Sequence, residues 1–125
     1  MDGKVIGEAL VCPDSIQGWL GLSDNGTIIE KGHPEEGKKI DGKILIMPCS
    51  KGSNDWSAHF VQASLEGHTP LAWAFTKIDS KCGFGVVALE IPAISDFLED
   101  MDPCKHIKTG DMLELDGDAG TITIL

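Results

Sequence analysis

A serine stands at a turn between two predicted elements, where its hydroxyl group could bind an anion or give up its proton. Ser53 lies in residues 42–57, GKILIMPCSKGSNDWS, in which a short apolar strand runs through a proline and a Gly-Ser turn into a helix-like stretch. The unpaired N–H groups and the positive dipole end of a helix N-terminus favour negative charge. Serine is also a preferred N-cap residue. Ser53 is therefore either a reactive hydroxyl or a cap.

The neighbours of Ser53 supply candidate contacts for an anionic substrate. The backbone N–H groups of Gly52 and Asn54 would support a negative charge, and Lys51 is the local candidate for a positive one. Lys51 can equally be a solvated turn lysine. Ser57 is in the same candidate set, although a hydroxyl in a first helical turn commonly bonds to a carbonyl one turn back.

The remaining candidate ligands are one histidine and the cysteines. His33 lies in a Gly-His-Pro loop, where it either helps to close an interface or makes a loop hydrogen bond. The cysteines form no C-x-x-C pair and have no histidine at zinc-ligand spacing, so we expect no metal site made by this chain alone. We expect buried, reduced thiols. Cys49, just before the Ser53 turn, is read as a strand end or as an exposed thiolate. The four cysteines are Cys12, Cys49, Cys82 and Cys104.

Length and hydropathy limit the class of protein. The 125 residues fit one domain, 1–125, with a modest core. No stretch approaches the roughly 20 apolar residues that span a bilayer. The N-terminal sequence lacks the basic start and apolar segment of a secretory signal. We therefore expect a cytoplasmic protein with no membrane partner.

Charge limits the partners. All ten basic residues are lysines, and 20 acidic residues give a formal net charge of −10. This charge repels phosphate backbones and anionic lipids, so we expect no nucleic-acid partner. The planar fork of arginine, which binds carboxylate and phosphate groups in bidentate fashion, is absent from the chain. An anionic substrate would therefore need another chain to hold it.

The pattern of apolar residues predicts a mixed α/β fold, more barrel-like than doubly wound. Residues 44–47 form a continuous apolar run, typical of a central strand that is buried on both faces. Strand 44–47, helix 53–66 and strand 71–75 form a crossover unit, with Ser53 at the carboxyl end of its first strand. Gly67 is the expected C-cap of that helix. The other predicted elements are strands 5–11, 27–30 and 86–91, a short helix 94–101, and a hairpin of residues 111–115 and 121–125.

Short motifs in a fixed order carry a resemblance to a known family. They are Gly7-Glu-Ala-Leu10, Gly18-Trp-Leu-Gly21, Gly26, Gly32-His-Pro34, Gly37, Gly42-Lys-Ile-Leu-Ile-Met-Pro48, Gly52-Ser53, Ser57, Pro70-Leu-Ala72, Gly83, Ile91-Pro92, Thr109-Gly-Asp111 and Asp116-Gly-Asp-Ala-Gly120. In their order and spacing the chain resembles the small, swivelling domain of the aconitase X family. The resemblance covers nearly the whole chain.

The resemblance implies a swivelling β/β/α domain, like the last domain of aconitase, docked against a larger subunit. That large subunit would carry an iron–sulfur cluster and most substrate contacts, while this chain would bind no cofactor by itself. The implied reaction is dehydration of a small anionic hydroxy acid, either phosphomevalonate or cis-3-hydroxy-L-proline. The proton acceptor of the family falls on Ser53. Trp56 replaces a small residue of the family pattern and is expected to crowd or cover the site.

Other functions fit the turn less well. A serine hydrolase would need a Gly-x-Ser-x-Gly elbow, and residues 51–55, KGSND, lack the second glycine. A swivelling phosphocarrier would carry a histidine in place of Ser53. The alternative that stays open is a non-catalytic swivelling or binding subunit that closes over the active site of a partner enzyme.

Overall fold

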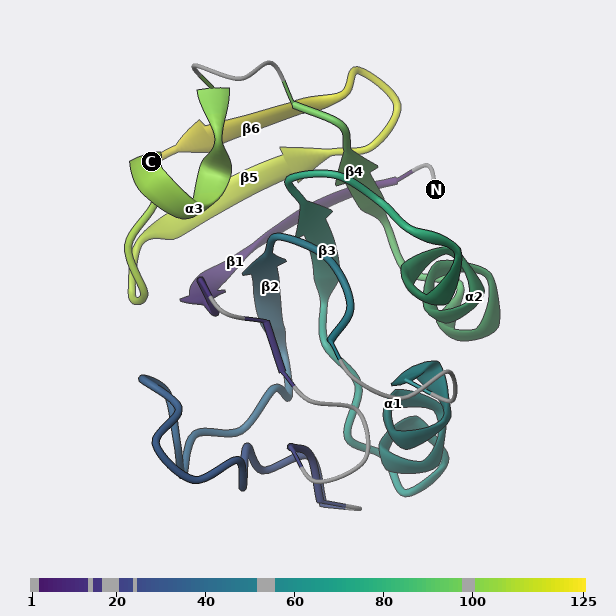
Figure 1. The fold of residues 1–125 in the computed structure, drawn as a ribbon. Coiled ribbons are helices and arrows are strands. Elements are labelled where there is room, and N and C mark those ends of the chain that lie inside the picture. Colours follow the sequence, from purple (N-terminus) through teal and green to yellow (C-terminus); the bar gives the residue numbers. More distant parts are fainter. Residues whose placement is uncertain (1–2, 14, 17–20, 24, 52–55, 98–100) are drawn as a thin grey trace.

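The computed structural model of the chain describes residues 3–13, 15–16, 21–23, 25–51, 56–97 and 101–125 (Figure 1). The fold is mixed α/β, as the sequence predicts. In chain order its elements are β1 (Lys4–Val11), β2 (Lys43–Met47), α1 (Trp56–Leu65), β3 (Ala72–Phe75), α2 (Ser80–Leu89), β4 (Ala93–Ser95), α3 (Pro103–His106), β5 (Met112–Asp116) and β6 (Thr121–Ile124).

The strands form one curled sheet in the order β4-β3-β2-β1-β5-β6. Strands β1 to β4 pair in parallel, whereas β5 pairs antiparallel with β1, and β6 pairs antiparallel with β5. The β5–β6 hairpin expected at the C-terminus is therefore confirmed. In Figure 1, α1 and α2 lie side by side, well away from this hairpin.

Strand β2 lies in the interior of the sheet and separates two apolar cores. Leu45 and Met47 pack in the core that α1 and α2 cover, while Ile44 and Ile46 pack in the core on the other face. All four side chains are fully buried. The continuous apolar run of residues 44–47 therefore correctly predicts a strand without a solvent face.

The crossover unit is confirmed, because β2 and β3 are parallel neighbours in the sheet and α1 connects them in the sequence. Helix α1 ends at Leu65, and Gly67 beyond it has the positive φ, 87°, expected of its C-cap. The N–H of His68 donates to the carbonyl of Ala63 at 2.8 Å, and the N–H of Gly67 donates to that of Ser64 at 3.0 Å. These two bonds satisfy the last carbonyls of the helix. The predicted start of α1, at Ser53 or Asn54, lies outside the described residues.

The predicted strand 27–30 is wrong. Thr27 and Ile28 each make a single isolated bridge, to Lys39 and Leu22 respectively. Ile28 is fully buried while Ile29 is exposed, an alternation that resembles a strand. The bridge partners of Thr27 and Ile28, however, lie in two different turns, so no continuous ladder of strand hydrogen bonds forms.

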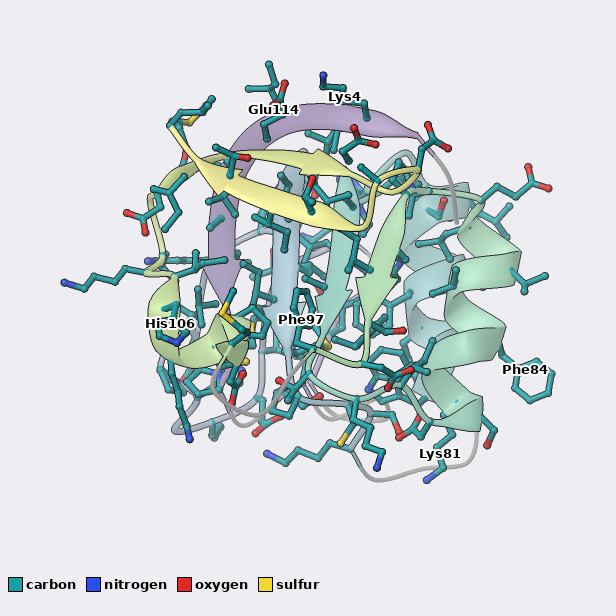
Figure 2. All side chains as sticks on the ribbon, turned by 90° about the horizontal axis from the view of Figure 1, so that it is seen from above. Lys4, Lys81, Phe84, Phe97, His106 and Glu114 are labelled. Carbon is teal, nitrogen blue, oxygen red and sulfur yellow. The ribbon has the colours of Figure 1, made fainter. Side chains whose placement is uncertain are left out.

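The predicted strand 86–91 is also wrong, because residues 80–89 form α2. Asp79 caps this helix, and Cys82 and Val86 are buried at helical spacing. Phe84 is 68% exposed and points outward from the helix (Figure 2). The strand at this place in the fold is β4, which begins just after Pro92.

The predicted helix 94–101 is wrong at its start. Ile94 belongs to β4, where it pairs with Ala74 of β3, and Asp96 then adopts a positive φ of 61°. A short helix follows only at Pro103, with Asp102 as its N-cap. Residues 98–100 lie outside the described residues.

Candidate functional site

The loop after β2 occupies the carboxyl edge of the parallel strands, where open α/β sheets bind ligands. The backbone N–H of Lys77, two residues beyond β3, donates to the carbonyl of Pro48 at 3.0 Å. The predicted turn Gly52-Ser53-Asn54 lies outside the described residues. An open hollow of about 410 Å³ adjoins the described part of the loop and is lined by Pro48, Cys49, Thr76, Lys77, Ile78 and Asp79.

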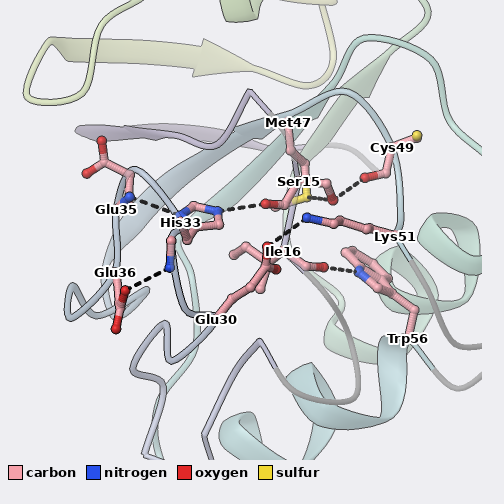
Figure 3. A network of polar contacts seen from close by, with 11 residues as sticks. Ser15, Ile16, Glu30, His33, Glu35, Glu36, Met47, Cys49, Lys51 and Trp56 are labelled. Carbon is pink, nitrogen blue, oxygen red and sulfur yellow. Dashed lines mark hydrogen bonds and ion pairs between the residues drawn. The ribbon is translucent and has the colours of Figure 1, made fainter.

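Ser15 holds the loop from one side. Its hydroxyl donates to the carbonyl oxygen of Cys49, and its own carbonyl accepts from the imidazole of His33 (Figure 3). Ser15 is buried and has a positive φ of 62°, a conformation that a non-glycine residue adopts only when its surroundings fix it. The loop after β2 is thus joined to the segment after β1.

Both ring nitrogens of His33 form hydrogen bonds, one to Ser15 and one to Glu35. Its Nε2 lies 2.7 Å from the carbonyl oxygen of Ser15, and its Nδ1 accepts from the N–H of Glu35 at 2.9 Å. These partners require the neutral tautomer with the proton on Nε2. The side chain is only 6% exposed. Both ring nitrogens are therefore bonded to backbone groups of the chain. The expected contact of His33 with the substrate stays a prediction.

Lys51 is the residue at which the described loop ends before Ser53. Its Nζ lies 2.7 Å from Oε2 of Glu30, whose side chain is only 15% exposed. The pair fixes the direction of the Lys51 ammonium group and offsets part of its charge. Lys51 is therefore neither a freely solvated lysine nor an uncompensated cation.

Asp79 holds the loop from the side of α2. Its Oδ2 accepts from the hydroxyl of Ser50 at 2.6 Å and from the N–H of Ser50 at 3.3 Å, while its Oδ1 accepts from the N–H of Cys82 at 2.9 Å. Burial alone would raise the pKa of Asp79, but the hydrogen bonds from Ser50 and Cys82 outweigh it and lower the pKa below its usual value. The carboxylate is therefore ionised at neutral pH.

The cysteines are free thiols, and each is held in its protonated form. Burial, with the nearby Glu35 carboxylate, raises the pKa of Cys12 to about 12. Burial also raises the pKa of Cys82 and of Cys104. Burial and the charge of Asp79 raise the pKa of Cys49, and the charge of Lys81 lowers it by less. The thiolate considered for Cys49 is therefore disfavoured.

Trp56 lies in the core and does not line the open hollow, whereas the turn at Ser53 that it is expected to crowd or cover lies outside the described residues. It is fully buried, and its indole N–H donates to the carbonyl of Ile16 at 2.8 Å. Its ring packs against Phe60 at 4.6 Å and Trp73 at 5.9 Å between centroids. The large side chain therefore fills the core beneath α1.

Ser57, the last of the candidate substrate contacts, is half-buried on the first turn of α1. A methyl group added to Gly85 of α2 would meet the Cβ of Ser57 at 3.6 Å. Ser57 therefore lies where α1 packs on α2. The carbonyl one turn back, to which we expect its hydroxyl to bond, belongs to Ser53 and lies outside the described residues.

Sequence reasoning missed three residues that hold the loop, namely Ser15, Glu30 and Asp79. Asp79 could have been recognised as a helix N-cap, because Cys82, Val86 and Leu89 follow it at helical spacing. No local sequence pattern identifies Ser15 or Glu30 as a residue that holds the loop. Each acts across a separation of 20 or more residues from its partner in the loop.

Among the described residues, no group of three or more histidine, cysteine, aspartate or glutamate side chains is arranged to hold a metal ion.

None of the helices within the described ranges is long and apolar enough to cross a membrane.

A model of one protein family, the aconitase X swivel domain, matches residues 1–124. The chain belongs to the aconitase X swivel domain family. The resemblance carried by its motifs is therefore confirmed.

Named relatives of this swivel domain are a dehydratase and small subunits of dehydratases. The phosphomevalonate dehydratase small subunit of Methanocella arvoryzae is 39% identical over 124 residues, which are 98% of this chain and 92% of that protein. The subunit of the same name from Methanosarcina acetivorans is 33% identical, over 98% of this chain and 85% of that protein. The cis-3-hydroxy-L-proline dehydratase of Pseudomonas aeruginosa is 27% identical over 70% of this chain but only 15% of that protein.

A solved structure has the same fold as this swivel domain. The crystal structure of Thermococcus kodakaraensis aconitase X in its holo-form superposes with a TM-score of 0.88 at 25% identity, over 99% of this chain and 92% of that chain. The expected swivelling β/β/α fold is thereby confirmed.

Proposed function

We propose that this chain is the small subunit of a heteromeric aconitase X-type hydro-lyase, and that its substrate is phosphomevalonate. Two relatives with this subunit name match the chain over almost its whole length, at 39% and 33% identity. The relative that acts on cis-3-hydroxy-L-proline matches with only 15% of its own length. We therefore rank phosphomevalonate above cis-3-hydroxy-L-proline as the substrate.

The observation that carries the proposal is the anchoring of the loop that leads to Ser53. The described part of this loop lies at the carboxyl edge of β2 and β3 and is fixed by Ser15, Asp79 and Glu30. A catalytic group must be held in a narrow range of positions to react efficiently, and an anchored loop can meet that requirement.

Ser53 is the proposed proton acceptor. Removing a proton beside a carboxylate requires a base, and serine is a weak one unless its alkoxide is stabilised. Ser53 comes three residues before Trp56, the first described residue of α1, and a helix N-terminus at this turn would favour negative charge near its hydroxyl. The backbone of Gly52 and Asn54 would add hydrogen bonds to the developing anion.

Lys51, Ser57 and His33 have supporting parts in the proposal. The Lys51 ammonium group, oriented by Glu30, would lend positive potential beside the alkoxide or the substrate. Ser57 would contact the substrate from the first turn of α1. His33 is proposed to act mainly by binding the carbonyl of Ser15, whose hydroxyl in turn holds the loop after β2.

A partner subunit is proposed to supply what this chain lacks. The sequence contains no arginine and has a formal net charge of −10, so strong binding of a phosphate and a carboxylate needs basic groups from elsewhere. Among the described residues, no group of histidine, cysteine or carboxylate side chains is arranged to hold a metal ion. The iron–sulfur cluster would lie in the large subunit, where it supplies the Lewis acid for the departing hydroxide.

The test is to co-express the chain with the aconitase X large subunit of the same genome and to purify the complex without oxygen. Dehydration is then measured with phosphomevalonate and with cis-3-hydroxy-L-proline. We expect a two-subunit complex that dehydrates phosphomevalonate, and neither subunit alone should do so. Activity on cis-3-hydroxy-L-proline alone would overturn the substrate, and failure of the two chains to associate would overturn the subunit role.

A further inference from the structure

The carboxylate of Asp79 makes two separate connections with its two oxygens. Oδ1 accepts from the N–H of Cys82 at 2.9 Å and so caps α2. Oδ2 accepts from both the hydroxyl and the N–H of Ser50, at 2.6 Å and 3.3 Å. Capping a helix needs only one acceptor oxygen. The second oxygen therefore serves the loop after β2 and not the helix.

Ser50 is the point at which main-chain pairing no longer connects this loop to the segment after β3. Up to Pro48 the two segments continue the pairing of their strands, with the N–H of Thr76 on the carbonyl of Met47 and that of Lys77 on the carbonyl of Pro48, both at 3.0 Å. Two residues further along, the connection passes to the side chain of Asp79. Ser50 stands three residues before Ser53 in the sequence.

The contact between Asp79 and Ser50 is strong for its place at the surface. Hydrogen bonds to an ionised carboxylate are about twice as strong as those between neutral groups. Asp79 and Ser50 are both half-buried, which lessens competition from water. The groups that face Asp79 are the Cys49 thiol, the hydroxyl and N–H of Ser50, and the thiol and N–H of Cys82. The protonated thiol of Cys49 carries no charge that would displace Asp79.

We propose that Asp79 is a positioning residue for the dehydration, which fixes the backbone at Ser50 to the N-terminus of α2 and thereby sets the place of Ser53. The inference rests on the role of Ser53 proposed above. Asp79 itself touches neither substrate nor reacting atoms. Its effect passes through the short segment between Ser50 and Ser53.

An isosteric substitution separates the two connections. In Asp79→Asn the amide oxygen can still accept from Cys82, and asparagine caps helices as well as aspartate does. The amide nitrogen would then face Ser50, where it can donate to the hydroxyl oxygen but cannot accept from the N–H. The variant therefore keeps the cap and replaces two hydrogen bonds to an ionised carboxylate with one between neutral groups, which weakens the connection to the loop. Asp116→Asn is the matched control, because Asp116 likewise accepts from two backbone N–H groups, those of Asp118 and Ala119 in the β5–β6 turn. Asp116 pairs with Lys4 at the start of β1, far along the sheet from the loop after β2.

The experiment measures kcat and KM of the two-subunit complex for phosphomevalonate. A displacement of about 1 Å can cost roughly 100-fold in rate, so we expect Asp79→Asn to lower kcat by roughly 10- to 100-fold. KM should change by less than about twofold, because the large subunit is proposed to supply most of the groups that bind the substrate. The control Asp116→Asn should leave both constants unchanged.

Further variants show whether the effect passes through Ser53. Ser50→Ala, which removes the hydroxyl from the same contact, should lower kcat, and Ser50→Thr, which retains a hydroxyl, should restore it. These two variants leave the cap of α2 untouched, so they answer the question even if Asp79→Asn folds poorly. In a background of Ser53→Ala, Asp79→Asn should cause no further loss, because both changes affect one function.

The outcomes are distinguishable. Suppose that Ser53→Ala abolishes turnover but Asp79→Asn and Ser50→Ala leave kcat unchanged, as Asp116→Asn does. The role of Ser53 as the base is then supported, and the positioning role of Asp79 is overturned. A loss in Asp79→Asn that adds fully to that of Ser53→Ala also overturns it. If Ser53→Ala leaves kcat unchanged, the proposed base itself fails, and the role of Asp79 fails with it.

Discussion

Ser15, Glu30 and Asp79 hold the loop after β2 without having reactive groups aimed at a substrate. Ser15 binds the Cys49 carbonyl, Glu30 pairs with Lys51, and Asp79 binds Ser50. Each bond fixes a different residue of the loop, so the loop has little freedom before it reaches Ser53. At the scale of single residues, precision comes from side chains that lie far away in the sequence.

His33 provides a test of this support at the residue scale. We expect His33→Ala to lower the free energy of unfolding by about 2 kcal/mol, because it leaves the buried carbonyl of Ser15 and the N–H of Glu35 without their partner. Chemical denaturation of the isolated chain measures this loss. His106→Ala, at an exposed position, is the control and should stay within about 0.5 kcal/mol of the wild type. An equal effect of both variants would contradict the support assigned to His33.

Asp79 gives a pH dependence with a defined sign. Its pKa is lower in the folded chain than the ordinary value of 3.8, so the folded state binds the proton less readily than the unfolded state. The stability that this provides is complete above about pH 4 and is lost as pH falls through the lower folded pKa. Asp79→Asn should therefore lose less stability than the wild type between about pH 5 and pH 2. Denaturant midpoints across this range, with Asp116→Asn for comparison, measure the difference; parallel curves for Asp79→Asn and the wild type would contradict it.

At the scale of elements, α2 decides how the carboxyl edge is built. It begins at Ser80 behind Asp79, and Cys82 and Val86 bury its inner face against the core shared with α1. The helix thus connects the hydrogen-bonded loop to the apolar core. Its glycines weaken it, because glycine in a helix interior costs conformational entropy.

Two glycines should respond to alanine in opposite directions. Gly83 lies inside α2 with no atom within 4 Å of an added methyl group, so Gly83→Ala should raise the free energy of unfolding by about 0.5–1 kcal/mol. Gly67 has a φ of 87° at the end of α1, so Gly67→Ala should lower it by about 1 kcal/mol. Thermal and denaturant unfolding of the two variants give both values. Destabilisation by Gly83→Ala would show that α2 does not have the described packing.

At the scale of the whole molecule, the sequence predicts what depends on local pattern. Residues 44–47 were predictable as a central strand because every side chain is apolar, and Gly67 as a C-cap because it follows the last apolar residue of its helix. The predictions for 27–30 and 86–91 were wrong for a different reason. Thr-Ile-Ile has strand propensity but finds no continuous partner, and a short apolar run fits a strand and a helix equally well.

The candidate site was predictable only in part for the same physical reason. A proline and a Gly-Ser turn after an apolar strand indicate a ligand-binding edge in the sequence itself. The hydrogen bonds that fix this edge connect Ser15 with Cys49 and Asp79 with Ser50, across 34 and 29 residues. Such contacts depend on how distant segments meet in the fold, and Ser15 needs an unusual backbone conformation to make its bond.

The central claim is that this chain contributes the proton acceptor, and the turnover of a Ser53→Ala complex tests it most directly. Ser64→Ala, near the other end of α1, is the matched control, since its hydroxyl bonds only to Thr69 among the described residues. General-base catalysis contributes about 10²- to 10⁴-fold, so kcat for phosphomevalonate should fall by about that factor in Ser53→Ala, with the complex intact and the control unchanged. An intact Ser53→Ala complex with the wild-type kcat would contradict the claim and assign the base to the large subunit.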